Sequence, residues 1–316
     1  MKHLRAQIVA TGSYVPSRVV PNSELEVSLH TTNEWIRSKI GIKERRYAEP
    51  DIGPADLALH AAIQALKTAN REARDIDCIL FATTTPEYEA PGSGVLLQDK
   101  LGCRRIPAFD VHNTSPGFLF ALELGDSLIR SGKYECILVA AGEVLSPRLD
   151  MTEAGRLMSV IFGDGAGCVL LEATEGPHGI LATKLHSDGV HYNKLWCEGP
   201  HTYPTMDGPF VFKHAVTSMS LVAKEILIEQ GIESNQLTHI IPHQANLRII
   251  ETIADQLKIP MAKVKTTIQK YGNTSAASIP ITLDETVRAG LVKPNDLILT
   301  MSFGSGFSWG AGLIRW

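Results

Sequence analysis

The stretch ECILVAAGE, residues 135–143, decides the fold class, because a similar stretch, DLILTMSFG, begins at residue 296, which is 161 positions later. A second pair keeps the same spacing, since CILF begins at residue 78 and HIIP at residue 239. Each half also ends in a Gly-Ala-Gly strand, GAGCVLL from residue 165 and GAGLIRW from residue 310. A repeat this long predicts two similar halves rather than a solenoid of short units.

The segments around these repeats predict an α/β fold. CILFATTT (78–85), ECILVAAGE (135–143) and GCVLLEA (167–173) have the apolar composition of buried strands. Residues 53–70 place several apolar side chains on one face at helical spacing, with Pro54 near the start. Strands that alternate with such helices predict helices packed on sheets. No linker-like segment separates the halves, so we expect two tightly packed domains, residues 1–172 and 173–316.

Composition and charge narrow the class of protein. The 316 residues are 44% hydrophobic, enough for a sizeable core. A net charge of -4 and a pI near 6.3 provide no basic excess for nucleic acid or an anionic membrane. The five cysteines are scattered without CxxC spacing, as in a reducing compartment. The N-terminus lacks a signal-peptide core, and no apolar run is long enough to span a membrane, so we expect a soluble cytoplasmic protein.

The stretch DVHNTSPGFLFALELGDSLIRSG (110–132) runs from the end of a strand into an apolar helix. Ser115 stands where this helix would begin, and Pro116 takes the favoured first helical position. The simplest interpretation is that Ser115 caps the helix. The alternative is that residue 115 is a nucleophile at the positive end of the helix dipole. A cysteine there would ionise readily, whereas a serine would need an adjacent base.

Two further motifs carry polar side chains just before predicted helices. His243 in IIPHQANLRII (240–250) follows a strand, and Asn273 in KYGNTSAASIP (270–280) lies among small residues. Alone, each is more often structural, the histidine as a buried or exposed side chain and the asparagine as a turn residue. Together they strengthen the case for a catalytic site.

The remaining polar and glycine-rich segments indicate neither a phosphate loop nor a metal site. FGDGAG (162–167) and SFGSGFSWGAG (302–312) match neither a P-loop nor a dinucleotide fingerprint, so we expect hairpin-like turns between strands. The second could aim a backbone N–H at a reacting carbonyl. No metal site is expected, because the spacing typical of metal ligands is not found among the histidines at 186, 191, 201 and 214.

These motifs resemble the thiolase superfamily, and specifically β-ketoacyl-acyl-carrier-protein synthase III. The resemblance extends over essentially the whole chain, and the pair PHQAN and YGNTSAAS is its most specific part. It implies a duplicated thiolase-like fold with five αβαβα layers, and a homodimer. It also implies an acyltransferase of the 3-oxoacyl-ACP synthase III type, with a buried Cys-His-Asn site at the end of a pantetheine tunnel. Such enzymes need no cofactor, since the coenzyme A thioester is a substrate.

The resemblance assigns roles to the three polar residues already singled out. Ser115 occupies the place of the acyl-accepting cysteine, while His243 and Asn273 match the pair that holds and activates the malonyl thioester. The chemistry agrees, because decarboxylation leaves an enolate oxygen that a His N–H and an Asn amide can stabilise. The backbone N–H groups of Ser115 and Ser305 match the oxyanion hole, although the family usually has glycine at 305.

Other positions correspond to the coenzyme A and pantetheine channel of the family, and some of them carry a different residue from the usual one. Trp35 and Arg156 take the places that flank the adenine of coenzyme A, and Lys39 replaces a common arginine. Pro209 stands where an asparagine often binds the pantetheine arm, so part of that contact is expected to be missing. Ala90 replaces a bulky Phe that limits the acyl pocket, which predicts room for a longer or branched primer.

A partner acyl carrier protein is acidic and would need basic residues on this negatively charged chain. We expect such a patch at Lys213 in VFKHAV and Arg248 in ANLRII, with further candidates Lys43, Arg45 and Arg46 in GIKERR. For any one of these residues taken alone, an ordinary solvated surface is the favoured interpretation.

Serine at position 115 leaves three functions open. The first is a condensing enzyme that acylates residue 115 from acyl-CoA and condenses the acyl group with a malonyl thioester, whether Ser115 is an inactivating replacement of cysteine or a natural variant, as in some starter-unit enzymes that resemble this family. The second is a serine acyltransferase in which His243 is the base and no decarboxylation occurs. The third is a non-catalytic subunit that binds acyl thioesters. The first is favoured, because a chain that had lost condensation would not need both His243 and Asn273.

Overall fold

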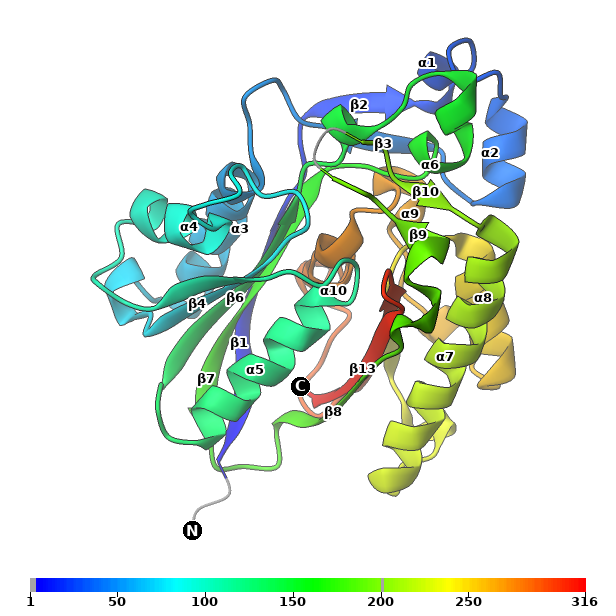
Figure 1. Cartoon of the computed structure of the whole chain (residues 1–316). Helices are drawn as coiled ribbons and strands as arrows, with labels where there is room; N and C mark the ends of the chain where they lie inside the picture. The colour runs from blue at the N-terminus through cyan, green and yellow to red at the C-terminus, as the bar shows by residue number, and fades with distance from the viewer. Residues whose placement is uncertain (1–3, 200–201) are drawn as a thin grey trace.

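The computed structural model describes residues 4–199 and 202–316, and its strands form two main sheets (Figure 1). The five-stranded sheet contains, in order, β1 (Arg5–Tyr14), β7 (Gly165–Thr174), β6 (Cys136–Glu143), β4 (Cys78–Ala82) and β5 (Ala108–Val111). The four-stranded sheet contains, in order, β11 (His239–Pro242), β12 (Leu297–Gly304), β13 (Ser308–Arg315) and β8 (Gly179–Ser187).

The two sheets share one topology, which confirms the predicted duplication. The order β1-β7-β6-β4 in the first sheet corresponds to β8-β13-β12-β11 in the second. Within these two sets of four strands, the strands at the repeated motifs pair in parallel and the other pairs are antiparallel. In the first sheet β4 also pairs in parallel with β5. The first sheet has β5 as an additional edge strand, and the second has at this place one parallel bridge between Ile240 and Val264. The predicted boundary at residue 172 falls just before the end of β7.

The helices form three layers around these sheets, which gives the expected αβαβα order. The outer layer on the first sheet contains α3 (Pro54–Ala69) and α4 (Ser93–Leu101). The middle layer, between the sheets, contains α5 (Gly117–Arg130) and α10 (Ser278–Arg288). The outer layer on the second sheet contains α7 (Gly208–Glu229) and α8 (Leu247–Gln256).

Shorter elements lie at the top and upper right of Figure 1. They are β2 (Arg18–Pro21), α1 (Asn22–Leu25), α2 (Asn33–Lys39), β3 (Glu44–Tyr47), α6 (Arg156–Ser159), β9 (Leu195–Trp196), β10 (Thr205–Met206) and α9 (Ile268–Tyr271). The 3-10 turns are Ala73–Asp75, Ser146–Arg148, Glu153–Gly155, Gly189–Lys194, Ser234–Gln236, Met261–Lys263 and Ser275–Ala277.

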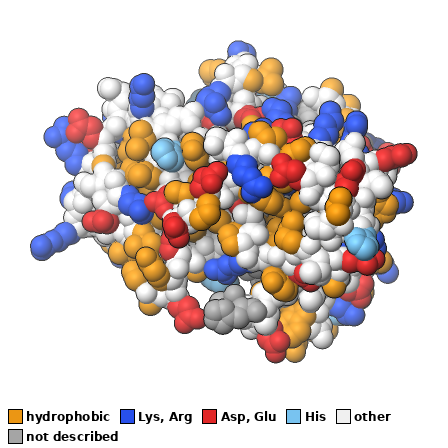
Figure 2. All heavy atoms as spheres, turned by 90° about the horizontal axis from the view of Figure 1, so that it is seen from above, with side chains coloured by type: hydrophobic (Ala, Val, Ile, Leu, Met, Phe, Trp, Pro, Cys, Tyr) orange, Lys and Arg blue, Asp and Glu red, His pale blue; other side chains and the backbone are white. Residues whose placement is uncertain are grey.

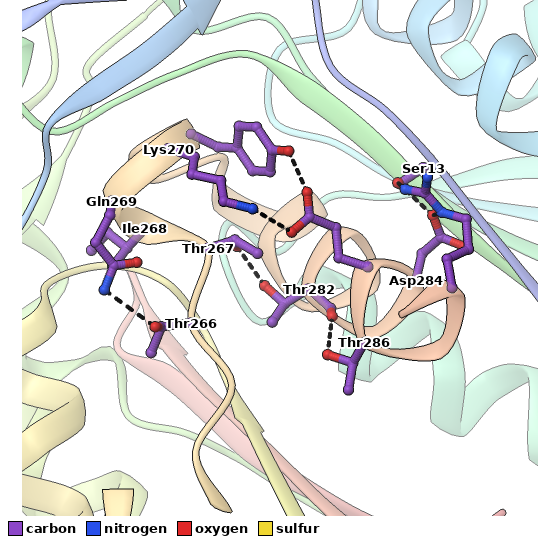
Figure 3. Close-up of polar contacts among 12 residues, drawn as sticks. Ser13, Thr266, Thr267, Ile268, Gln269, Lys270, Thr282, Asp284 and Thr286 are labelled. Atoms are coloured by element: carbon purple, nitrogen blue, oxygen red, sulfur yellow. Dashed lines mark hydrogen bonds and ion pairs between the residues drawn. The ribbon is translucent and has the colours of Figure 1, made fainter. Parts of the chain in front are cut away.

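The middle helices are held between the sheets by both apolar and polar contacts. Apolar side chains of α5 and α10 belong to one core with those of both sheets. Polar side chains of α10 are bonded as well (Figure 3), since the Thr267 and Thr282 hydroxyl oxygens lie 2.7 Å apart and Ser13 Oγ donates to Asp284 at 2.6 Å. Such buried polar groups require partners, so α10 has one well-defined position.

Several local predictions can be compared with the structure. The helix predicted for residues 53–70 is confirmed as α3, with Pro54 as its first residue. The cysteines in apolar runs are buried, as expected: Cys78, Cys136 and Cys168. The hairpin predicted at 302–312 joins β12 to β13. The one predicted at FGDGAG is wrong, because this segment leads from helix α6 into β7. Within the described ranges no helix is long and apolar enough to cross a membrane.

Candidate active site

Ser115 lies in the tight connection between β5 and the buried helix α5. The preceding residue, Thr114, has φ 42°, a left-handed conformation that is costly for a β-branched residue. Thr114 O accepts a hydrogen bond from Gly117 N at 2.9 Å, which closes the turn. The capping interpretation of Ser115 is wrong, because the helix begins at Gly117, its N-cap is Pro116, and no side chain caps it. The Ser115 side chain is therefore not used to start the helix.

The end of strand β12 packs directly against this turn. A Cβ atom built on Gly304 would lie 2.5 Å from the Thr114 hydroxyl and 3.2 Å from Ser115 N, so only glycine fits there. Ser305, the next residue, is half-buried. The structure thus places the two segments predicted to form the oxyanion hole side by side.

His243 follows strand β11 and is connected to Ser115 through β12. Its backbone N–H donates to Met301 O at 2.8 Å, and Met301 precedes Gly304 by three residues on the same strand. The imidazole is 3% exposed, and its Nδ1 lies 2.6 Å from Ser278 Oγ. Ser278 Oγ also accepts the Gln244 N–H at 3.3 Å. These contacts favour the tautomer in which Ser278 donates to Nδ1 and the ring proton is on Nε2.

Burial lowers the pKa of His243 from its ordinary value to about 3. The ring is consequently neutral at neutral pH, because a charged imidazolium would lose its hydration. A neutral ring with its proton on Nε2 is a hydrogen-bond donor toward the site. The neutral ring is therefore better suited to stabilise a negative oxygen than to accept a proton as a general base.

The low pKa of His243 leads to a pH prediction. The rate at which the protein decarboxylates a malonyl thioester should be flat between about pH 5.5 and pH 8, since the histidine charge does not change there. Initial rates of CO2 release across this range test the prediction. The prediction would be contradicted if the pH–rate profile changed with an apparent pKa near 6.5 and this change disappeared in His243→Gln. Such a result would show that the ring titrates as an ordinary histidine.

Asn273 is oriented by its own loop. Its Oδ1 accepts the Ser275 N–H at 2.8 Å, so the amide oxygen is engaged and the Nδ2 donor is the end left for a ligand. The backbone of Asn273 donates to Ile161 O at 2.9 Å and accepts from Gly163 N at 3.0 Å, which ties the loop to FGDGAG. The side chain is buried, at 6% exposure.

Three contacts bring these residues to one place between the sheets. β12 links His243 to Ser115, as described. The loop after Asn273 contacts the start of α5, because a Cβ built on Gly117 would lie 3.8 Å from the Ala276 Cβ. Ser278, which contacts His243, begins α10, the helix that directly follows the Asn273 loop.

Gln244 and Ser278 belong to the site but were not singled out from the sequence. Gln244 is fully buried, and its Oε1 accepts the N–H groups of Thr267 and Ile268 at 3.0 and 3.2 Å. It thereby joins the His243 loop to the segment that leads to Asn273 (Figure 3 shows this segment beside α10). The only sequence signal was their position inside the motifs PHQAN and NTSAAS.

The residues predicted to bind coenzyme A gather around helix α2. The Arg156 guanidinium carbon lies 6.0 Å from the Trp35 ring centroid, and Arg156 Nη1 donates to His30 O at 2.9 Å. Lys39 is exposed at the end of α2, and its backbone oxygen accepts from Asn246 Nδ2 at 3.3 Å. Pro209 is exposed in the first turn of α7.

Of the residues predicted for the carrier patch, Lys213 and Arg248 lie on the surface and Arg45 is buried. Lys213 and Arg248 are both exposed, and the Arg248 guanidinium carbon lies 5.9 Å from the ring of Phe212, the residue before Lys213. Arg45 cannot belong to a surface patch, because it is 0% exposed and donates to Asn22 Oδ1 and Val160 O. Burial lowers its pKa to about 10.

Neighbouring positions complete the comparison with the sequence predictions. Lys43 is exposed, and Arg46 pairs with Glu44 at 2.8 Å. The face seen in Figure 2 mixes basic, acidic and apolar side chains rather than presenting one basic field. Ala90 is exposed on the loop that leads to α4. Among the described residues no cluster of three or more potential ligands could hold a metal, and His201 lies outside them.

Comparisons with known proteins agree with this geometry. Family models described as 3-oxoacyl-[acyl-carrier-protein] synthase III match residues 109–189, and those for its C-terminal part match residues 227–316. The β-ketoacyl-[acyl-carrier-protein] synthase III of Ruegeria sp. is 42% identical over 99% of both chains. The chain belongs to the β-ketoacyl-acyl-carrier-protein synthase III family. It is accordingly an acyltransferase of the condensing type.

Solved structures of the synthase III family have the same fold. The 3-oxoacyl-[acyl-carrier-protein] synthase III of Aquifex aeolicus matches with a TM-score of 0.95 and 42% identity, over 98% of this chain and 100% of that one. The priming β-ketosynthase of the R1128 polyketide pathway matches with a TM-score of 0.93 and 32% identity, over 98% and 96%. The thiolase-like architecture inferred from the motifs is therefore confirmed.

Proposed function

We propose that this synthase III condenses an acyl group, taken from acyl-CoA onto residue 115, with the malonyl thioester of an acyl carrier protein. In the first half-reaction the oxygen of Ser115 attacks the thioester carbonyl. The carbon–sulfur bond breaks, coenzyme A leaves as the thiol, and an acyl ester forms on Ser115. The N–H groups of Ser115 and Ser305 would stabilise the negative oxygen of the tetrahedral intermediate.

In the second half-reaction the malonyl group loses CO2 and becomes a nucleophile. The bond to the carboxylate breaks and its electron pair forms an enolate, whose oxygen accepts from His243 Nε2–H and Asn273 Nδ2–H. The enolate carbon then attacks the acyl ester, the bond to Ser115 Oγ breaks, and the serine oxygen takes up a proton from water to regenerate the hydroxyl. No cofactor takes part.

The observation that carries this proposal is the orientation of the two donors. His243 is neutral with Nδ1 occupied by Ser278, and Asn273 has its oxygen occupied by the Ser275 amide. Both side chains therefore offer N–H groups to the site. To act as a general base for Ser115, His243 would instead need an unprotonated ring nitrogen facing the serine. The serine acyltransferase is therefore only the second candidate.

Labelled substrates distinguish the three candidate functions. The protein is incubated with acyl-CoA and then with malonyl carrier protein labelled in its carboxyl carbon, and both intact mass and released CO2 are measured. Release of CO2 with formation of 3-oxoacyl carrier protein supports condensation. An acyl adduct that transfers without CO2 supports the serine acyltransferase, and the absence of both an adduct and CO2 supports a binding subunit.

Strand β5, at the edge of the first sheet, is the proposed contact between two copies of the chain in a homodimer. β5 pairs on one side only, with β4, and Phe109 on it is 40% exposed. An uncovered edge strand is a template for pairing with another chain, here a second copy. The loop that carries Ala90 lies beside this edge, since Ser93 N and Gly94 N donate to Asp110 at 2.8 and 2.7 Å. Ala90 would thus face the partner subunit and border its acyl pocket.

Replacing Ala90 with Phe tests the proposed pocket. The variant is expected to bind medium-chain acyl-CoA more weakly and acetyl-CoA almost normally, because each buried CH2 contributes roughly 0.8 kcal/mol until space runs out. Affinities for acetyl- and octanoyl-CoA are measured by calorimetry. Equal losses for both ligands would show that residue 90 does not limit chain length.

Reversing the charges of Lys213 and Arg248 tests the proposed carrier patch. The double variant Lys213→Glu/Arg248→Glu is expected to raise KM for malonyl carrier protein and to weaken its salt dependence, since steering by opposite charges is screened by salt. Binding of acyl-CoA should remain as before. Lys184→Glu, on the far strand β8, is a matched control. Unchanged carrier kinetics would eliminate the patch.

A further inference from the structure

One buried carboxylate near the site takes no part in the proposed reaction. Glu143, the last residue of β6, is 0% exposed. Its oxygens accept from the Thr84 N–H at 3.0 Å and from the hydroxyls of Thr85, Thr84 and Thr83 at 2.8, 3.2 and 3.3 Å. A fully buried carboxylate with this many donors is a costly feature that must have a fixed set of partners.

The partners of Glu143 extend into the loop that carries Asn273. The turn Ser275–Ala277 packs against β6, and the Ser275 side chain is one of the polar groups that act to lower the pKa of Glu143 against the larger raising effect of burial, which places Ser275 beside this carboxylate. Ser275 has φ 48°, a left-handed conformation that serine rarely adopts and that needs support from its surroundings. In this conformation the Ser275 N–H donates to Asn273 Oδ1 at 2.8 Å. A continuous chain of contacts thus joins Glu143 in the first half to Asn273 in the second.

The direction of the Asn273 amide depends on this chain of contacts. While the Ser275 N–H binds Oδ1, the amide offers Nδ2–H to the substrate. If Ser275 relaxed to an ordinary conformation, its N–H would turn away and the amide could rotate. The carbonyl oxygen would then face the enolate oxygen, where two negative atoms repel one another.

We propose that Glu143 is a positioning residue, which through Ser275 fixes the Asn273 amide with its N–H toward the malonyl thioester. This inference rests on the proposed role of Asn273 as an enolate donor. A purely structural role is the alternative, because Glu143 also joins the end of β6 to the residues after β4. Such a role would affect the free energy of unfolding, whereas the proposed one also affects decarboxylation specifically.

A double-mutant cycle separates the two roles. Glu143→Gln keeps the shape of the side chain but replaces one acceptor oxygen by an amide donor. We expect it to lower kcat for malonyl-thioester decarboxylation by about tenfold or more, in line with loss of one oriented donor. In the Asn273→Ala background the same substitution should change kcat by less than about twofold, because there is no amide left to orient. An effect of the same size in both backgrounds would overturn the proposal.

Two further variants exclude a general loss of structure. Ser275→Ala removes the hydroxyl that meets Glu143 while the buried carboxylate stays, and it should lower decarboxylation in the same direction. Asp126→Asn is the matched control, since Asp126 is another buried carboxylate that accepts a backbone N–H, from Ala6 at 2.9 Å, but lies on α5 away from the Asn273 loop. It should reduce the melting temperature and leave kcat unchanged. Normal decarboxylation by Ser275→Ala would contradict the proposal.

Failure of the proposed function would give a different result. In that case the unsubstituted protein would release no CO2 and Asn273→Ala would change nothing, so the cycle would have no starting activity. Acylation of residue 115, measured by intact mass in a Ser115→Cys background, supplies a second readout. The rate of acylation should be the same in Ser115→Cys and in the double variant Ser115→Cys/Glu143→Gln. A parallel loss of acylation would indicate disruption of the whole site.

Discussion

Replacing Ser115 with cysteine is expected to raise the rate of self-acylation by acyl-CoA by orders of magnitude. The start of α5 supplies N–H groups and positive potential, which can turn a thiol into a thiolate but cannot ionise a hydroxyl. The turn itself should be preserved, because the Ser115 side chain makes no capping bond in it. Intact mass recorded over a time course gives both rates.

The control for this experiment is Ser115→Ala, which should form no adduct at position 115. Binding of acyl-CoA should be similar in all three proteins, since only the reacting atom differs. If the serine protein acylates as fast as its cysteine variant, the serine is itself an activated nucleophile. His243 would then have to lie within about 2.6 to 3.2 Å of its oxygen, and the chain would act as a serine acyltransferase.

Removing the imidazole of His243 is expected to have the second largest effect. His243→Ala should lower malonyl-thioester decarboxylation by about 10²- to 10³-fold, the usual cost of one donor to a developing negative oxygen. Release of labelled CO2 from malonyl carrier protein measures the loss. Acylation of the Ser115→Cys variant should change much less, because a thiolate at the helix start needs no base. An equal loss in both half-reactions would make His243 the base for residue 115.

The duplicated fold was predictable because hydrophobic patterns repeat at a fixed spacing. CILF and HIIP became β4 and β11, and ECILVAAGE and DLILTMSFG became β6 and β12, in equivalent places of the two sheets. The position of His243 directly after a strand followed from the same pattern, whereas Asn273 stood out only in its own motif. The family motifs added their chemical roles, which periodicity alone could not supply.

Several contacts that hold these residues in place could not be predicted, because they join positions far apart in the sequence. Ser278 lies 35 positions from His243, and Glu143 and the Asn273 loop belong to different halves. The strained conformations of Thr114 and Ser275 have no sequence signature either, since both residue types usually avoid positive φ.

Two of the predictions that failed, those for Ser115 and Arg45, failed for physical reasons that the structure makes clear. Ser115 looked like a helix cap because serine before proline is common there, but the left-handed Thr114 shifts the helix start to Gly117. Arg45 looked like part of a basic surface because it lies in a charged run. Strand β3 alternates, so Arg45 points inward and binds carbonyl oxygens while its neighbours point outward.

Decarboxylation of malonyl carrier protein by the unsubstituted protein, without acyl-CoA, tests the central claim most directly. The claim is that the His243 and Asn273 donors are intact although residue 115 is a serine, and decarboxylation depends on these donors and not on the nucleophile. The account predicts steady release of labelled CO2 that His243→Ala and Asn273→Ala each reduce strongly. Release no faster than the enzyme-free background, from a protein shown to be folded, would contradict it.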